Sequence, residues 1–241
     1  MNLLILISVF ATSTLSGILG MAGGMILMAI LVSLTPVSTS MVVHGLVQAT
    51  ANGSRTFFLR RHIEFNILPA YLLGAAVSFT LFTLLAIVPE AGIILIAIGI
   101  FPWAARLLPL LKGLDVTRGT TAMSCGLLVT AAQLFAGASG PLLDVFYLNS
   151  KLTRYQVIAT KAFTQAIGHL IKLVYYGVVI GVTQTLPVWL LAAAIITSIL
   201  GTRLGTSLLS YLSEHHFRRV SSLVILCVGT LCILEGVLKL S

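Results

Sequence analysis

The chain has 241 residues, of which 58% are hydrophobic and only 8% are charged, and its mean hydropathy is +1.10. A soluble globular domain has about 25% charged residues, so this composition excludes one and is typical of an integral membrane protein. Eight membrane helices of ~20 residues need ~160 residues, which leaves room for short loops but not for a soluble domain.

The net charge is +8, from 14 Lys and Arg against 6 Asp and Glu. No basic run has enough chain around it for a nucleic-acid-binding module, so we expect no nucleic-acid partner and assign the charge to loops that orient the chain in the bilayer. The three cysteines lie in apolar segments without CxxC spacing, which predicts neither a disulfide framework nor a metal site. We expect no cofactor.

Hydropathy predicts eight apolar segments in chain order. The first begins at residue 2 without the basic start of a signal peptide and continues into a Gly-rich stretch, so we interpret it as a membrane segment. The first and fifth are the longest, and each contains a Gly-rich interruption, so we expect both helices to be broken. The segments are 2–33, 38–58, 66–88, 91–111, 119–148, 155–182, 186–211 and 218–239.

Two halves of the chain align at an offset of 117 residues. The alignment pairs Gly20 with Gly137, Gly23 with Gly140 and Gln48 with Gln165. These matched features predict an internal duplication, with a transmembrane repeat in residues 1–115 and a second in residues 118–241.

The loop charges bear on the orientation of the repeats. Basic residues gather around 55–64, 104–118, 150–154 and 203–219. If the broken fifth segment returns to the side it came from, all four loops face the cytoplasm, as the positive-inside rule requires. The second repeat is then inverted relative to the first, which is a common plan of secondary transporters. The predicted fold is therefore an all-α polytopic membrane protein of two inverted four-segment repeats.

The Gly-rich interruptions are the first candidate site. A half-helix that begins at such a break aims free N–H groups and the positive end of its dipole at the cavity, which suits an anion. Close packing between helices is the alternative use of such glycines. The candidate residues are Gly20, Gly23, Gly24 and Met25 in the first break, and Gly137, Ser139, Gly140 and Leu142 in the second.

Polar residues on the second and sixth segments are the second candidate site. Spacings of four, four and three residues place each set on one helix face, and polar groups inside a span usually face a cavity or a partner. Arg55 and Lys172 lie near span ends and can instead snorkel, while Gln48 and Gln165 can instead link helices. The sets are His44, Gln48, Asn52 and Arg55, and Lys161, Gln165, His169 and Lys172.

Asp144 follows the second break and has no acidic counterpart in the first repeat. It is a candidate for proton or cation coupling, or for the counter-ion of Lys161. The alternative is a loop-facing carboxylate.

Residues 137–140 also match the GxSG pattern of rhomboid intramembrane proteases, with Ser139 as nucleophile and His169 as a base on the next segment. The first repeat has no serine at the equivalent place. A structural role of the backbone would explain the Gly-rich sequence in both repeats, whereas a catalytic serine would explain it only in the second. We therefore do not expect an enzyme.

Taken with its segment plan, the chain resembles the TauE/SafE family of sulfite and organosulfonate exporters. The resemblance rests on GILGMAGG (17–24), on FAGASGPLLD (135–144) and on ATKAFTQAIGHLIKLVYYG (159–177), although Ala22 replaces one of the family's usual glycines. It implies ion-gradient-driven transport of a small sulfur-containing anion, and the sequence agrees in having no P-loop.

We therefore predict a multi-pass secondary transporter of the cell membrane, an exporter of sulfite or an organosulfonate, with its site between the repeats. The predicted partners are the anion and the lipid bilayer. An anion channel of similar fold remains an alternative, and the sequence leaves the oligomeric state open, a homodimer included.

Overall fold

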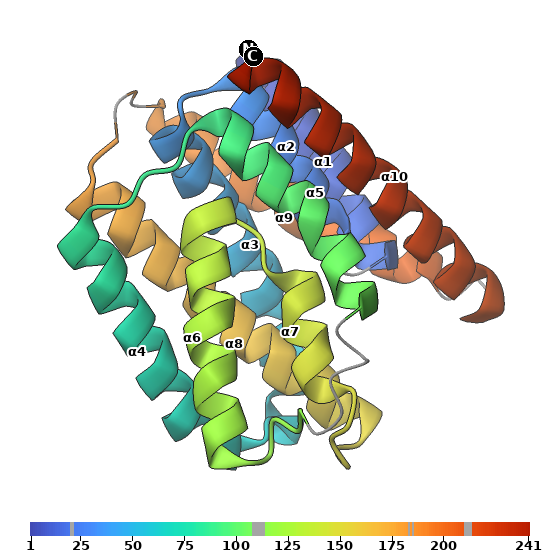
Figure 1. The fold of residues 1–241 in the computed structure, drawn as a ribbon. Coiled ribbons are helices and arrows are strands. Elements are labelled where there is room, and N and C mark those ends of the chain that lie inside the picture. The colour runs from blue at the N-terminus through green and yellow to red at the C-terminus, as the bar shows by residue number, and fades with distance from the viewer. Residues whose placement is uncertain (20–21, 108–113, 183, 185, 210–213) are drawn as a thin grey trace.

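The computed structural model describes the chain except residues 20–21, 108–113, 183, 185 and 210–213. The described residues form helices and no strand (Figure 1). Short helical segments lie between the α-helices: the 3₁₀-helices η1 (Arg60–His62) and η2 (Phe65–Ile67), and a π-helix, η4 (Tyr175–Val179). The α-helices are α1 (Asn2–Leu19), α2 (Ala22–Leu34), α3 (Val37–Leu59), α4 (Leu68–Leu85), α5 (Ala91–Leu107), α6 (Gly119–Ala136), α7 (Gly140–Tyr147), α8 (Arg154–Val174), α9 (Val188–Leu209) and α10 (Glu214–Leu240).

Within the described residues, four helical stretches are long and apolar enough to cross a membrane: Phe65–Leu85, Gly119–Ala136, Val188–Leu208 and Leu223–Leu240. Shorter apolar helices cover Asn2–Ile18, Ala22–Leu34 and Ala91–Ala104. The polar residues of α3 and α8 keep these two helices out of both groups. The structure is thus that of an all-helical multi-pass membrane protein, and the number of eight spans stays a prediction.

The second predicted break lies between α6 and α7. Gly137 adopts φ +76° and caps α6 with a 2.9 Å hydrogen bond from its N–H to Gln133 O, a conformation that favours glycine. Pro141 occupies the first turn of α7, where its missing N–H costs nothing. The first predicted break falls on residues 20–21, which lie outside the described residues, although α1 ends at Leu19 and α2 begins at Ala22.

Four helix pairs make the main packing contacts: α1 with α9, α4 with α6, α3 with α8, and α5 with α10. Glycines bring these backbones together. A Cβ on Gly17 would lie 2.7 Å from Thr202 O of α9, and a Cβ on Gly229 would lie 3.0 Å from Gly99 O of α5. Gly17 in the first Gly-rich stretch is therefore used for close helix packing.

The helices α3 and α8 run antiparallel through the middle of the molecule (Figure 1). Gly45 near the start of α3 packs against Leu173 at the end of α8. Past the end of α3, the Glu64 N–H donates to Thr160 Oγ1 near the start of α8 at 2.9 Å. The two sets of polar residues on α3 and α8, called the polar stripes from here on, therefore meet at one interface.

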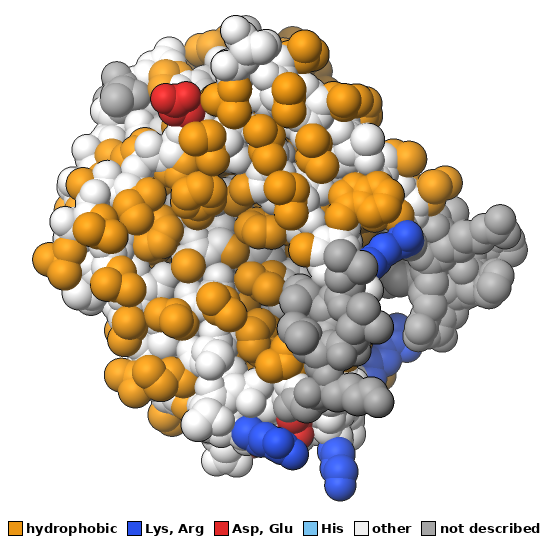
Figure 2. Space-filling model, viewed as in Figure 1, with side chains coloured by type: hydrophobic (Ala, Val, Ile, Leu, Met, Phe, Trp, Pro, Cys, Tyr) orange, Lys and Arg blue, Asp and Glu red, His pale blue; other side chains and the backbone are white. Residues whose placement is uncertain are grey.

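Hydrophobic side chains cover most of the face seen in Figure 2, and the described Lys and Arg side chains on it gather at the lower and right margins. Large apolar side chains on the outside are abundant, among them Leu84, Val178 and Leu238. A contiguous apolar surface of this kind fits contact with lipid.

Candidate functional site

Lys172 lies in the last turn of α8, where α8 packs against α3, and is completely buried. Its Nζ donates to His44 Nδ1 at 2.7 Å and to Gly137 O at 2.9 Å. Since an ammonium group has only donors, His44 Nδ1 accepts, and the other ring nitrogen, Nε2, donates to Gly24 O at 2.8 Å. Lys172 and His44 thus tie together α6 at the second break and α2 just after the first.

Burial overturns the idea that Lys172 snorkels to the membrane surface. Its partners are a neutral imidazole nitrogen and the carbonyl of Gly137, where the negative end of the α6 dipole lies. No described carboxylate pairs with Lys172. A buried cation without a counter-charge is costly, so this position favours the approach of an anion.

His169 lies on α8 next to the contact between Lys172 and His44. Its ring centroid lies 5.5 Å from that of His44 with an interplanar angle of 65°. The side chain is 3% exposed, and its Nδ1 has no hydrogen-bond partner among the described protein atoms. The structure therefore brings His44, His169 and Lys172 together from the two stripes.

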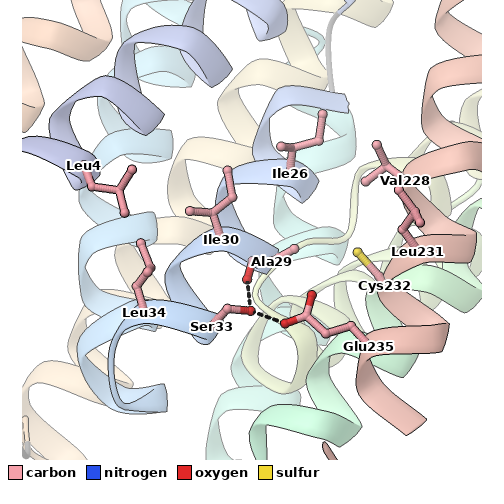
Figure 3. A pocket seen from close by; sticks show the side chains of 10 residues that line it. All are labelled: Leu4, Ile26, Ala29, Ile30, Ser33, Leu34, Val228, Leu231, Cys232 and Glu235. Carbon is pink, nitrogen blue, oxygen red and sulfur yellow. Dashed lines mark hydrogen bonds between the residues drawn. The ribbon is translucent and has the colours of Figure 1, made fainter. Parts of the chain in front are cut away.

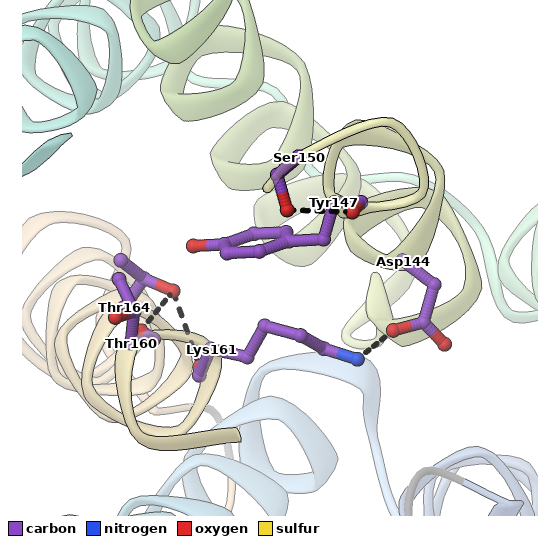
Figure 4. A network of polar contacts seen from close by, with 6 residues as sticks. All are labelled: Asp144, Tyr147, Ser150, Thr160, Lys161 and Thr164. Carbon is purple, nitrogen blue, oxygen red and sulfur yellow. Dashed lines mark hydrogen bonds and ion pairs between the residues drawn. The ribbon is translucent and has the colours of Figure 1, made fainter. Parts of the chain in front are cut away.

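Lys161, at the other end of the α8 stripe, forms an ion pair with Asp144 of α7 (Figure 4). Both side chains are partly exposed, and Arg55 of α3 is close enough to act electrostatically on Lys161. Of the roles that the sequence left open for Asp144, the structure shows the ion pair with Lys161. The eight stripe residues accordingly do not form one cluster, since Lys161 and Arg55 lie toward a different end from Lys172.

A family model for the sulfite exporter TauE/SafE matches residues 4–231 of the 241-residue chain. The chain belongs to the TauE/SafE family. No curated protein and no solved structure matches it. Family membership implies a multi-pass membrane transporter of the exporter type for sulfite or a related sulfur anion, which confirms the resemblance in the sequence motifs.

The glutamines of this TauE/SafE chain differ in their surroundings. Gln165 accepts a hydrogen bond from Gln133 Nε2 of α6 at 3.0 Å, so it links two helices as the alternative held. Gln48 packs against the first turn of α2, where a Cβ on Gly24 would lie 3.1 Å from its Nε2. Asn52 donates to Gln48 O at 3.0 Å and so turns back onto its own helix.

Gln133 contacts the candidate residue Gln165 and was not singled out from the sequence. The signal was a lone amide one helical turn before the Gly137 break in an apolar helix. Its contact with α8 requires Gly168, because a Cβ at that position would run into Gln133 Oε1 and lie 2.8 Å from its Cδ.

The candidate residues of the Gly-rich breaks have mixed roles. Gly20 lies outside the described residues. Gly23 packs against α1, where a Cβ would lie 2.7 Å from Ser16 N, so its contact is with a helix. Met25 is buried in the apolar core. Gly24 contacts both His44 and Gln48.

In the second break, Gly137 supplies its carbonyl to Lys172. Gly140 and Leu142 lie in the first turn of α7, and Leu142 packs against an apolar cluster that includes Tyr147. The next N–H, that of Leu143, already donates to Ser139 O at 3.0 Å, so it is not free to hold an anion.

Ser139 is 1% exposed, and its Oγ has no hydrogen-bond partner among the described protein atoms. The Ser139–His169 hydrogen bond that a rhomboid-type nucleophile needs is therefore not formed in this TauE/SafE chain.

A pocket of about 380 Å³ lies elsewhere, between α2 and α10 (Figure 3). Its lining is apolar except near Ser33, whose Oγ donates to Glu235 Oε1 at 2.6 Å. None of the candidate site residues lines it.

Proposed function

We propose that this TauE/SafE chain is a gradient-coupled secondary transporter that exports sulfite or a small organosulfonate across the cell membrane. The observation that carries the proposal is the buried Lys172 amino group, held between Gly137 of α6 and His44, which itself contacts Gly24 of α2, with no described carboxylate beside it. A sulfur oxyanion is a compact ligand that supplies the missing negative charge.

The groups around Lys172 suit an anion that must be released again. Gln48 and Gln165 offer neutral amide donors near the breaks, and Gln165 Nε2 has no described partner. A single cation with amide donors binds an anion less tightly than several fixed charges would. Protonation of His44, His169 or Asp144 is the proposed means of coupling to an ion gradient.

Alternating access by two inverted repeats is part of the proposal, and the helix boundaries support it. α1 and α6 each have 18 residues and begin 117 residues apart, and α3 and α8 begin 117 residues apart as well. Exchanging the two halves converts the α1–α9 pair into the α6–α4 pair. The equivalent helices α3 and α8 run antiparallel, as inverted repeats require.

A thermal-shift screen of the purified protein tests the proposal. Sulfite, sulfate, thiosulfate, sulfoacetate, taurine and simple carboxylates are compared, and a ligand at 100 times its Kd should stabilise the protein by ~2.7 kcal/mol. We expect stabilisation by a sulfur oxyanion that is lost in Gln48→Ala together with Gln165→Ala. Stabilisation by carboxylates alone, or full retention in the double variant, would overturn the substrate or the site.

A further inference from the structure

Buried polar side-chain atoms without a hydrogen-bond partner are concentrated in one part of the molecule. Six of the ten such atoms in the described residues lie on α6, α7, α8 and the turn before α7, and a seventh is the hydroxyl oxygen of Tyr71 on α4, which packs against α6. Each buried donor or acceptor that is left unpaired lowers the stability of the fold by ~1–3 kcal/mol. A concentration of such atoms in one interface therefore calls for a physical explanation.

Three of these atoms are hydroxyls of Tyr71, Thr130 and Tyr147, whose side chains are 0%, 0% and 5% exposed. The Tyr71 hydroxyl faces those of Thr130 and Thr164. The Tyr147 ring points its hydroxyl toward Thr164, beside the Lys161–Asp144 pair (Figure 4). No hydrogen bond of ordinary geometry joins the hydroxyls of Tyr71, Thr130 and Tyr147 to one another.

Further unpartnered atoms on α6 and α8 form a row that leads from these hydroxyls, here called the hydroxyl cluster, toward Lys172. Gln133 Oε1, Gln165 Nε2 and His169 Nδ1 follow the hydroxyl cluster in that direction. Lys161, Gln165, His169 and Lys172 recur at intervals of three or four residues, so they share one face of α8. The eleven residue steps from Lys161 to Lys172 span ~16 Å along the helix axis, about half of a ~30 Å hydrocarbon core.

The corresponding place in the first half of the chain differs. At the offset of 117 residues, Thr130 corresponds to Ser13 and Thr164 to Val47. Val47 lies in an apolar cluster with Leu31 and Val43. Ser13 donates to Ser198 Oγ at 3.4 Å, and Ser198 donates to Val47 O at 3.3 Å. Within the described residues, no buried polar side-chain atom of α1, α2 or α3 lacks a hydrogen-bond partner, and Thr202 Oγ1 of α9 is the one such atom on the helices that correspond to α6, α7, α8 and α4. The row of unpartnered atoms therefore belongs to the second half of the repeat alignment.

We propose that ordered water molecules occupy the interface of α6, α7 and α8, and that this row is an aqueous half-pathway from the Lys161–Asp144 pair to Lys172. A buried water needs two to four polar partners, and the convergent hydroxyl and amide atoms supply them. Asp144 offsets the charge of Lys161, so Arg55 leaves a net positive charge at that end of the row, which favours anions entering the path. The hydration itself does not rest on the proposed function, whereas the role as an anion route does.

Hydroxyl-radical footprinting of the wild-type protein by X-ray radiolysis tests the hydration, since radicals form from water next to the labelled side chain. Tyr71 and Tyr175 are both fully buried. Tyr175 serves as the matched control because its hydroxyl donates to the backbone carbonyls of Phe82 and Ile87. We expect Tyr71 to be labelled several-fold faster than Tyr175. Equal labelling would overturn the proposal.

Cysteine accessibility gives a second, independent test. Thr164→Cys and Val47→Cys are made in a chain whose native Cys125, Cys227 and Cys232 are replaced by Ala, and both positions are 0% exposed. A small water-soluble methanethiosulfonate should modify the cysteine at 164 several-fold faster than that at 47. Equal rates would contradict the hydrated row. Neither readout needs transport, so hydration without sulfite binding would refute the proposed function but leave the water row intact.

Discussion

Lys172 is the most deeply buried ionisable residue in the candidate site, with an exposed fraction of 0%. Its spacing from Lys161 indicates a polar helix face, but spacing alone left open whether it faced lipid, the membrane surface or the protein interior. Burial and the bonds to His44 and Gly137 O settle that it faces the interior. Those contacts depend on how α8 docks between the breaks, which is a tertiary feature that a one-dimensional pattern does not contain.

Replacing Lys172 by Met is expected to weaken sulfite binding at least ~10-fold, because a charge-assisted hydrogen bond contributes ~1.5–3 kcal/mol. Titration calorimetry on the purified protein measures this. Lys239→Met is the control, since Lys239 lies at the end of α10 beside Glu235. Equal sulfite affinity in Lys172→Met and wild type would remove Lys172 from the site.

Gly168→Ala tests the contact between Gln133 and α8. The added methyl group has no room beside Gln133, and overpacking of this kind costs ~1–3 kcal/mol, so the thermal unfolding temperature should fall. Gly53→Ala is the matched control, because nothing lies within 4 Å of a Cβ there and alanine favours a helix by ~0.5–1 kcal/mol. Similar shifts in both variants would contradict the close approach.

At the scale of elements, the broken fifth segment followed from its glycines and Pro141, because these residues disfavour a continuous helix. The polar stripes followed from their spacing. The spacing did not predict which partner each lysine of the stripe has: Lys161 forms an ion pair with Asp144, while Lys172 donates a hydrogen bond to His44. The hydroxyl cluster also escaped notice, since Tyr71, Thr130 and Tyr147 come from three different helices.

Gly137→Ala tests the break between α6 and α7. A residue with a Cβ is strained at φ +76°, and the methyl group would contact Met28, so we expect a loss of ~1–3 kcal/mol in stability. Thermal unfolding with Gly119→Ala as control measures this, since a Cβ at Gly119 meets nothing within 4 Å. An unchanged unfolding temperature in Gly137→Ala would contradict the strained cap.

At the level of the whole molecule, composition was enough to predict a membrane protein, because the high apolar content excludes a soluble globular domain. The long apolar segments were enough to predict that it is all-helical. The motifs were enough to indicate the TauE/SafE family, which the family model confirms. The number of spans and the inverted repeats stay predictions, since membrane crossing depends on lipid as well as on helix length.

The two termini lie at the same end of the molecule, opposite the connections after α3 and α7 (Figure 1). Those connections carry Arg60, Arg61 and Lys151, so the positive-inside rule predicts that they face the cytoplasm and that the termini face outward. An alkaline phosphatase fused after Ser241 should therefore be active, whereas a green fluorescent protein there should stay dark. The reverse pattern would contradict the predicted orientation.

Counterflow in proteoliposomes tests directly whether the chain is a sulfite carrier. Vesicles preloaded with unlabelled sulfite are diluted into a trace of ³⁵S-sulfite, and a carrier that alternates access accumulates the label transiently. We predict such accumulation for the wild-type chain and none for Lys172→Met. Equilibration of the label without an overshoot would indicate a channel, and an absence of sulfite-dependent uptake would contradict a sulfite carrier altogether.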